Sequence, residues 1–84
     1  MKRIVVSVRP FLKNQPLQIY EDDKAYAEYD FPLLNLGENI FKLCQSLNIT
    51  NVEIKGNPIF TKSIKNQITN LNKFDANKIN INLY

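Results

Sequence analysis

The segment KRIVVSVR, residues 2–9, decides the fold. Its apolar side chains are all β-branched: Ile4, Val5, Val6 and Val8. Because successive side chains of a strand point to opposite sides, these residues place apolar groups on both faces of an extended chain. A strand that is apolar on both faces is typical of a sheet interior covered on either side. We therefore predict that residues 2–9 form the central strand of a sheet and that both of its faces are covered.

Two further strands follow the first one. Pro16 is expected to open the second strand, residues 17–20, since a proline can begin a strand but removes a hydrogen bond inside one. The polar turn at residues 21–24 then reverses the chain into a third strand, residues 25–31. Its apolar face contains Ala25, Ala27, Tyr29 and Phe31, and its other face contains Tyr26, Glu28 and Asp30. Charge on one face predicts an edge strand, because charge discourages unwanted strand pairing.

A helix, a strand, a second helix and a last strand complete the chain. Asn35 is the predicted N-cap of the first helix, and Glu38 three residues later would complete a capping box. The apolar stripe of this helix is Leu36, Ile40, Leu43, Cys44 and Leu47, and Asn48 ends it. After a strand at residues 49–55, Asn57 is expected to cap a second helix with Pro58 at its first position. A turn at residues 75–77 leads to the last strand, residues 79–83.

This element order, βββαβαβ, predicts a mixed α/β fold: one domain, residues 1–84, with a five-stranded mixed sheet and two helices. Crossovers between parallel strands are right-handed in nearly all proteins. We therefore expect the first, fourth and fifth strands to run parallel, with the first strand in the middle.

The composition excludes several classes of site. The chain has no histidine and one cysteine, Cys44, which argues against a zinc site, a disulfide framework or a cysteine–histidine nucleophile. A single thiol fits a reducing cytoplasm. The apolar run Ile4–Val6 is too short for a signal peptide or a membrane span, so a cytoplasmic protein without membrane association is expected. Asn, Ile and Lys are frequent, which indicates an AT-rich genome and, by association, a phage or another mobile element acting in a host cytoplasm.

The element order resembles that of the ribonuclease-H-like core, which the actin-like ATPases share. The resemblance implies metal-holding carboxylates on the first strand, on the first helix and near the fourth strand. Here the first strand offers only Ser7, while Glu38 and Glu53 stand on the other two elements. The ATPases bind phosphate through glycine-bearing hairpin turns, and the turn at residues 9–16 has no glycine. We expect this scaffold without its catalytic and phosphate-binding motifs, and hence no enzyme and no cofactor. A degenerate metal-dependent nuclease using Glu38 and Glu53 is the third hypothesis, after protein binding and nucleic-acid binding.

The first candidate site is acidic and aromatic. Its predicted partner-binding residues are Glu21, Asp22, Asp23, Tyr26, Glu28, Asp30 and Tyr84. Exposed tyrosines are frequent in protein interfaces, and an acidic patch can bind a basic protein or mimic DNA. The plain alternative is a hairpin tip and edge that only keep the protein soluble. Partner binding here would use the hairpin edge or addition of a strand to the sheet, and a homodimer through an edge strand is one version of it.

The second candidate site is basic. Residues 54–74 contain four lysines and no acid: Lys55, Lys62, Lys65 and Lys73. Such a helix can follow a phosphate backbone without reading bases, or it can be an ordinary solvated helix face. The Gly56-Asn57-Pro58 helix start can hold an anion or serve only as a turn and cap.

These observations favour a small noncatalytic binding protein that modulates a host or self macromolecule through protein–protein contact. Nonspecific nucleic-acid binding through the lysines of the second helix is the alternative.

Overall fold

The elements occur in the predicted order in the computed structural model, which describes residues 1–73 and 78–84. Their bounds are β1 (Lys2–Ser7), β2 (Asn14–Glu21), β3 (Lys24–Pro32), α1 (Leu36–Leu47), β4 (Asn51–Lys55), α2 (Pro58–Asn72) and β5 (Asn80–Leu83). The fold is therefore a mixed α/β fold with five strands and two helices, as predicted. The turn predicted at residues 75–77 lies outside the described residues.

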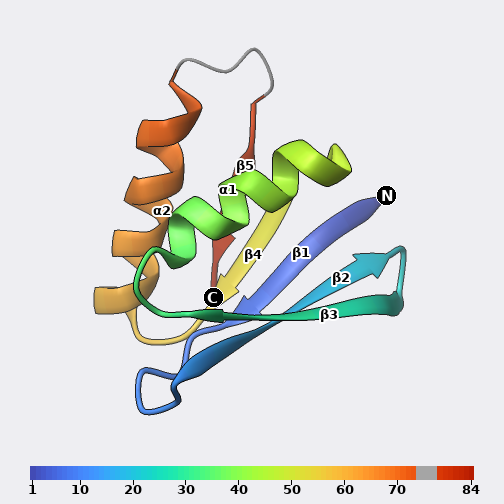
Figure 1. Ribbon diagram of the computed structural model, residues 1–84. Coiled ribbons are helices and arrows are strands. Elements are labelled where there is room, and N and C mark those ends of the chain that lie inside the picture. The colour runs from blue at the N-terminus through green and yellow to red at the C-terminus, as the bar shows by residue number, and fades with distance from the viewer. Residues whose placement is uncertain (74–77) are drawn as a thin grey trace.

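The five strands form one sheet in the order β3-β2-β1-β4-β5 (Figure 1). β1 pairs antiparallel with β2 and parallel with β4, and β5 is parallel to β4. The predictions that β1 is central, that β1, β4 and β5 are parallel and that β3 is an edge strand are all confirmed. β5 forms the other edge.

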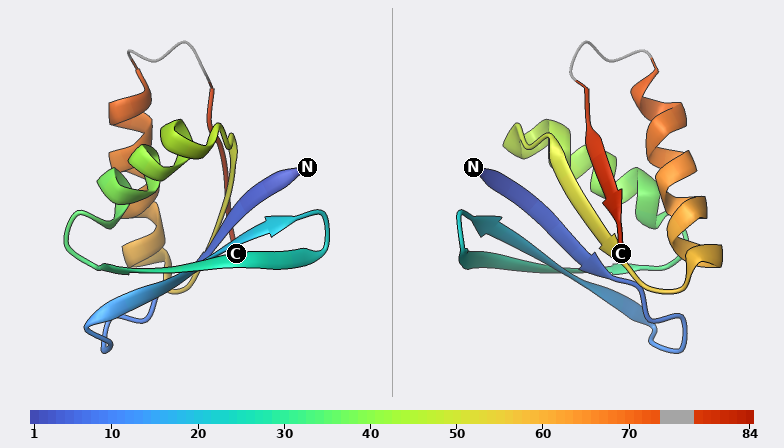
Figure 2. Two further views of the ribbon diagram at one scale, coloured as in Figure 1. Left: turned by 45° about the vertical axis from the view of Figure 1, so that its right-hand side comes forward. Right: turned by 180° about the vertical axis from the view of Figure 1, so that it is seen from behind.

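The expectation that both faces of β1 are covered is wrong. Ile4 and Val6 are fully buried beneath the helices, whereas Val5, between them, is only partly buried. Two successive right-handed crossovers in the same direction place α1 and α2 on one face, where they pack against each other. Seen from behind, β1, β4 and β5 lie in front of α1, and no described helix crosses them (Figure 2).

A single apolar core fills the space between the sheet and the two helices. Its fully buried members come from every layer: Ile4, Val6, Leu17, Ile19, Leu36, Ile40, Val52, Ile54 and Ile68. These residues alternate along the strands and recur at helical spacing in α1 and α2, as an amphipathic pattern requires. The residues that alternate with these buried ones along each strand consequently lie on the opposite face of the sheet.

The two helix starts differ. Asn57 caps α2 as predicted, because its Oδ1 accepts a hydrogen bond from Ile59 N at 2.9 Å, and Pro58 is the first helical residue. The capping box predicted for α1 is wrong: Asn35 has a left-handed backbone (φ 63°) and its side chain makes no capping hydrogen bond. Glu38 instead lies 3.3 Å from Lys42 Nζ, one turn along the helix. Asn48 ends α1 in the left-handed conformation, which confirms that boundary.

Two strand predictions also need correction. Pro16 lies inside β2 instead of opening it, which is tolerated because the β1–β2 pairing already ends at Leu17. In β3, a register irregularity opposite Ile19 and Tyr20 brings Ala25 opposite Tyr20 and Ala27 opposite Ile19. Ala25 and Ala27 therefore do not share one face as strict alternation predicted.

Candidate interaction surfaces

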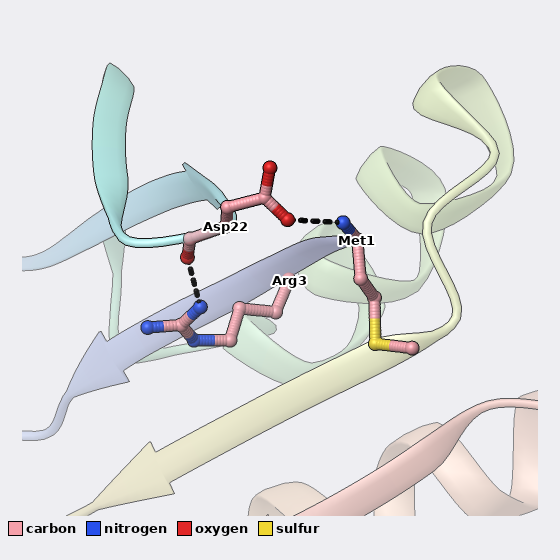
Figure 3. Close-up of polar contacts among 3 residues, drawn as sticks. All are labelled: Met1, Arg3 and Asp22. Atoms are coloured by element: carbon pink, nitrogen blue, oxygen red, sulfur yellow. Dashed lines mark hydrogen bonds and ion pairs between the residues drawn. The ribbon is translucent and has the colours of Figure 1, made fainter.

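The β2–β3 turn is fastened to the start of the chain. The Met1 ammonium nitrogen lies 2.8 Å from Asp22 Oδ1, and Arg3 donates a hydrogen bond to the Asp22 carbonyl oxygen (Figure 3). The hydrogen bond and charge of the ammonium group hold the pKa of Asp22 below its ordinary value of 3.8. Asp22 has a left-handed backbone (φ 56°), a conformation that Asp and Asn adopt more readily than most residues.

This tip of the hairpin is not a purely acidic patch. Lys2 and Lys24 are the register partners of Glu21 on the two neighbouring strands. The Asp22 carboxylate contacts the Met1 ammonium group, and the Asp22 carbonyl oxygen accepts a hydrogen bond from Arg3. Three carboxylates, those of Glu21, Asp22 and Asp23, thus lie among the Met1 ammonium group and the cations of Lys2, Arg3 and Lys24. The structure gives the predicted acidic surface a mixed charge, which weakens the electrostatic case for a DNA mimic.

β3 leaves its outer edge without a strand partner among the described residues. The strand is nine residues long and exposed along most of its length. Tyr26 is 50% exposed, with Lys2 Nζ 5.9 Å from its ring centroid, and Tyr29 stacks on Phe31 with centroids 6.1 Å apart. A long edge with accessible aromatic rings is able to pair with another extended chain.

A row of polar contacts crosses the uncovered face of the sheet. Arg3 on β1 bonds Glu53 on β4 with 2.6 Å between Nε and Oε2, and its guanidinium carbon lies 4.8 Å from the ring centroid of Tyr20. The Tyr20 hydroxyl contacts Gln18 Oε1 at 3.1 Å, and Gln18 Nε2 donates to Glu28 Oε1 at 3.0 Å. These contacts tie four strands together side by side.

This row of contacts was not predicted from the sequence. Each member occupies a position of the same parity on its strand, so period-two alternation puts them on one face. Nothing in the sequence states which residue of β4 stands beside which residue of β1, and the contact of Arg3 with Glu53 depends on that register.

The predicted partner-binding residues do not form one surface. Glu28 and Asp30 pair with Gln18 and Pro16, so they share the uncovered face. Tyr84 is exposed but follows β5, at the opposite edge of the sheet from β3. Tyr84 is thus separated from the hairpin by the width of the sheet.

The basic residues are divided between two layers. Lys62 and Lys65 are exposed on α2, and Lys73 directly follows this helix. The helical repeat puts residue 73 on the same side of the helix as residues 62 and 65, so these three lysines lie along one stripe. Lys55 pairs with Ser7 at the end of β4, and its parity places it on the uncovered face of the sheet. The Gly56–Pro58 segment is a turn whose cap is supplied by Asn57 itself.

The two carboxylates of the nuclease alternative lie on different layers. Glu38 is on α1, on the helix-covered side, whereas Glu53 is on the uncovered face beside Arg3. Ser7, on β1, stands beside Lys55. Among residues 1–73 and 78–84, no three Asp, Glu, Cys or His side chains gather closely enough to hold a metal ion.

A hollow of about 350 Å³ lies between the start of α1 and the second half of α2. Its lining is polar except for one residue: Asn35, Glu38, Gln67, Asn70 and Leu71. Gln67 Oε1 accepts a hydrogen bond from Gly37 N at 3.0 Å, so the side chain that lines the hollow also joins the two helices.

None of the protein-family models, curated proteins or solved structures compared with this chain matches it. No helix within the described part of the chain is long and apolar enough to cross a membrane.

Proposed function

We propose that this chain is a noncatalytic protein-binding domain that modulates a host or self macromolecule, and that it binds by adding an extended segment of its partner to the edge of β3. The observation that carries the proposal is the length and exposure of that edge strand. In strand addition, main-chain hydrogen bonds supply affinity and alternate side chains supply specificity.

The exposed rings of β3 support the same proposal. Tyr26 and Tyr29 lie on the edge strand itself, and tyrosine is enriched at protein interfaces because it contributes a large contact area with little loss of conformational freedom. The row from Glu53 to Glu28 stiffens the sheet behind this edge, so β3 is presented on a rigid support. We infer a ribonuclease-H-like scaffold from the element order, and in this proposal the scaffold supplies the sheet that presents the edge of β3.

The experiment is capture of partners by the tagged full-length chain, followed by mass spectrometry and by hydrogen exchange of the complex. Binding through β3 predicts that its amides gain protection and that Tyr29→Lys weakens capture, since edge lysines oppose strand pairing. Lys65→Glu is the matched control on α2 and should leave capture unchanged. Capture of nucleic acid alone, or protection confined to α2, would contradict the proposal.

The stripe Lys62, Lys65 and Lys73 favours a second candidate, nonspecific nucleic-acid binding. α2 has no acidic residue, so a phosphate backbone along it would meet cations and amides only. Under this alternative, Lys62→Glu with Lys65→Glu abolishes retention on DNA and Tyr29→Lys does not.

A further inference from the structure

Three of the connections between strands and helices lie at one end of the molecule. β1, β4 and β5 are parallel, and β3 runs in the same direction because it is antiparallel to β2. The segments that leave β1, β3 and β4 therefore start at the same end of the sheet. Both figures of the fold show the β1–β2, β3–α1 and β4–α2 connections beside one another (Figures 1 and 2). We call this region, residues 8–13, 33–35 and 55–62, the carboxyl end.

Large apolar side chains protrude from the first two connections and from the first turn of α2, which follows the third. Phe11 is 82% exposed, Leu34 is 80% exposed and Ile59 is 76% exposed. Leu12, in the same connection as Phe11, is also exposed. Single exposed apolar residues are ordinary, but a group of them at one end of a small domain indicates an interaction surface.

Hydrogen bonds hold the backbone that carries these exposed apolar side chains, which we call the apolar tips. Gln15 is completely buried; its Oε1 accepts from Arg9 N and its Nε2 donates to the Leu12 carbonyl at 3.1 Å, which fixes the turn that carries Phe11. Asn57 caps α2 and so fixes the position of Ile59. Phe11 and Ile59 therefore stand on hydrogen-bonded backbone, which lowers the entropic cost of binding.

The charge around these tips is mainly positive. The exposed cations of the carboxyl end are Arg9, Lys13, Lys55 and Lys62. Two acidic side chains precede a strand end by two residues: Asp30 on β3, and Glu53 on β4, which is bonded to Arg3. The carboxyl end is thus apolar at its tips and cationic around them.

We propose that the carboxyl end docks onto the surface of an anionic lipid membrane. Phe11, Leu34 and Ile59 project from separate segments at one end of the sheet and are each largely exposed, so they suit insertion into the boundary between headgroups and acyl chains. The surrounding lysines and arginine would attract anionic headgroups. Docking of this kind needs no spanning segment, and it uses a different surface from the β3 edge.

The test is co-sedimentation of the full-length protein with phosphatidylcholine vesicles, with and without phosphatidylglycerol. We expect binding to the anionic vesicles only, weakened by salt. Replacing Phe11, Leu34 and Ile59 together by serine should reduce binding more than about tenfold. Neutralising Lys13 or Lys55 to glutamine should reduce it about fivefold each. Tyr26→Ser, at the other end of the sheet, and Lys65→Gln are the matched controls and should bind as the unaltered chain does.

Three results would overturn the proposal. The first is the absence of binding to anionic vesicles. The second is a failure of the variants to differ as expected. Either the triple serine variant binds as tightly as the unaltered chain, or Lys65→Gln weakens binding as much as Lys55→Gln does. The third is retention on heparin that needs the same cations but none of the apolar tips, which would identify an anionic polymer as the ligand. Circular dichroism of each variant checks that the fold is intact.

Discussion

The backbone N–H of Gly37 lies 3.0 Å from Gln67 Oε1, and a Cβ atom on Gly37 would lie only 2.4 Å from that same oxygen. The contact places the start of α1 directly against α2. It also uses an N–H of the first helical turn that has no partner within its own helix. Because Asn35 contributes no capping hydrogen bond, the side chain of a second helix satisfies part of this helix start.

We predict that Gly37→Ala destabilises the protein by about 1–3 kcal/mol. Alanine favours a helix over glycine by about 1 kcal/mol, but the added methyl group would also lie 2.6 Å from Gln67 Cβ and 3.1 Å from the Ile64 carbonyl oxygen. Since Cβ and a backbone oxygen cannot swing aside, the clash outweighs the propensity. Urea denaturation measures the difference. In a Gln67→Gly background, which removes the Cβ of residue 67, the cost of Gly37→Ala should shrink, and an equal cost in both backgrounds would contradict the steric explanation.

The contact of Asp22 with the Met1 ammonium group predicts an acid-sensitive contribution to stability. The pKa of Asp22 is lowered in the folded protein, so the native state favours the ionised carboxylate. This contribution is present above the ordinary pKa of 3.8 and is lost as pH falls below it through the folded pKa. Asp22→Asn should make the free energy of unfolding less sensitive to pH in this window. Asn tolerates the left-handed backbone at this turn, and Asp23→Asn is the neighbouring control; an identical acid dependence in the Asp22→Asn variant would refute the assignment.

Burial predicts an unreactive thiol at Cys44. Desolvation raises the pKa of Cys44 to about 11 from an ordinary value of 9.0. A rise of that size lowers the thiolate fraction about a hundredfold at pH 7.5, and the thiolate is the reactive form. Labelling with a disulfide reagent should therefore be slow in the folded protein and fast in urea. Rapid labelling under native conditions would mean that α1 opens easily or that Cys44 is not packed as described.

The bond between Arg3 and Glu53 should couple β1 to β4. Their side chains are 32% and 20% exposed, so solvent screens the pair less than it screens a surface ion pair. A double-mutant cycle with Arg3→Met and Glu53→Gln should give a coupling energy of about 1 kcal/mol by chemical denaturation. The pair Lys42 and Glu38, which is more exposed, is the control and should give about 0.3–0.5 kcal/mol or less. A smaller coupling for the pair across the strands than for the pair on the helix would contradict this ranking.

The local sequence predicted much of the framework. The β-branched run from Ile4 to Val8 identified the central strand, and the order of the elements with right-handed crossovers fixed three parallel strands. Asn57 with Pro58 marked the start of α2 correctly, because that cap forms between neighbours in the chain. Signals of this kind act over a few residues and can be recognised without knowing the rest of the fold.

The sites depended on the tertiary structure. Arg3 meets Glu53 and Tyr20 only because of strand register, and the Met1 ammonium group and Lys2 lie beside the hairpin tip only because β1 pairs with β2. Asn35 loses its expected capping role because the chain enters α1 in a left-handed conformation and Gln67 of α2 takes the first-turn N–H.

The sequence by itself determined which segments are strands and helices, because periodicity is a local property. It also determined which strands run parallel, because the order of the elements and the handedness of crossovers restrict the topology. Only the tertiary structure decided that both helices cover the same face, that Val5 and its polar neighbours stay uncovered, and that Phe11, Leu34 and Ile59 protrude at one end. The physical reason is that register, the packing of helices on one side and the gathering of separate loops all arise from contacts between residues far apart in the chain, for which no local pattern exists.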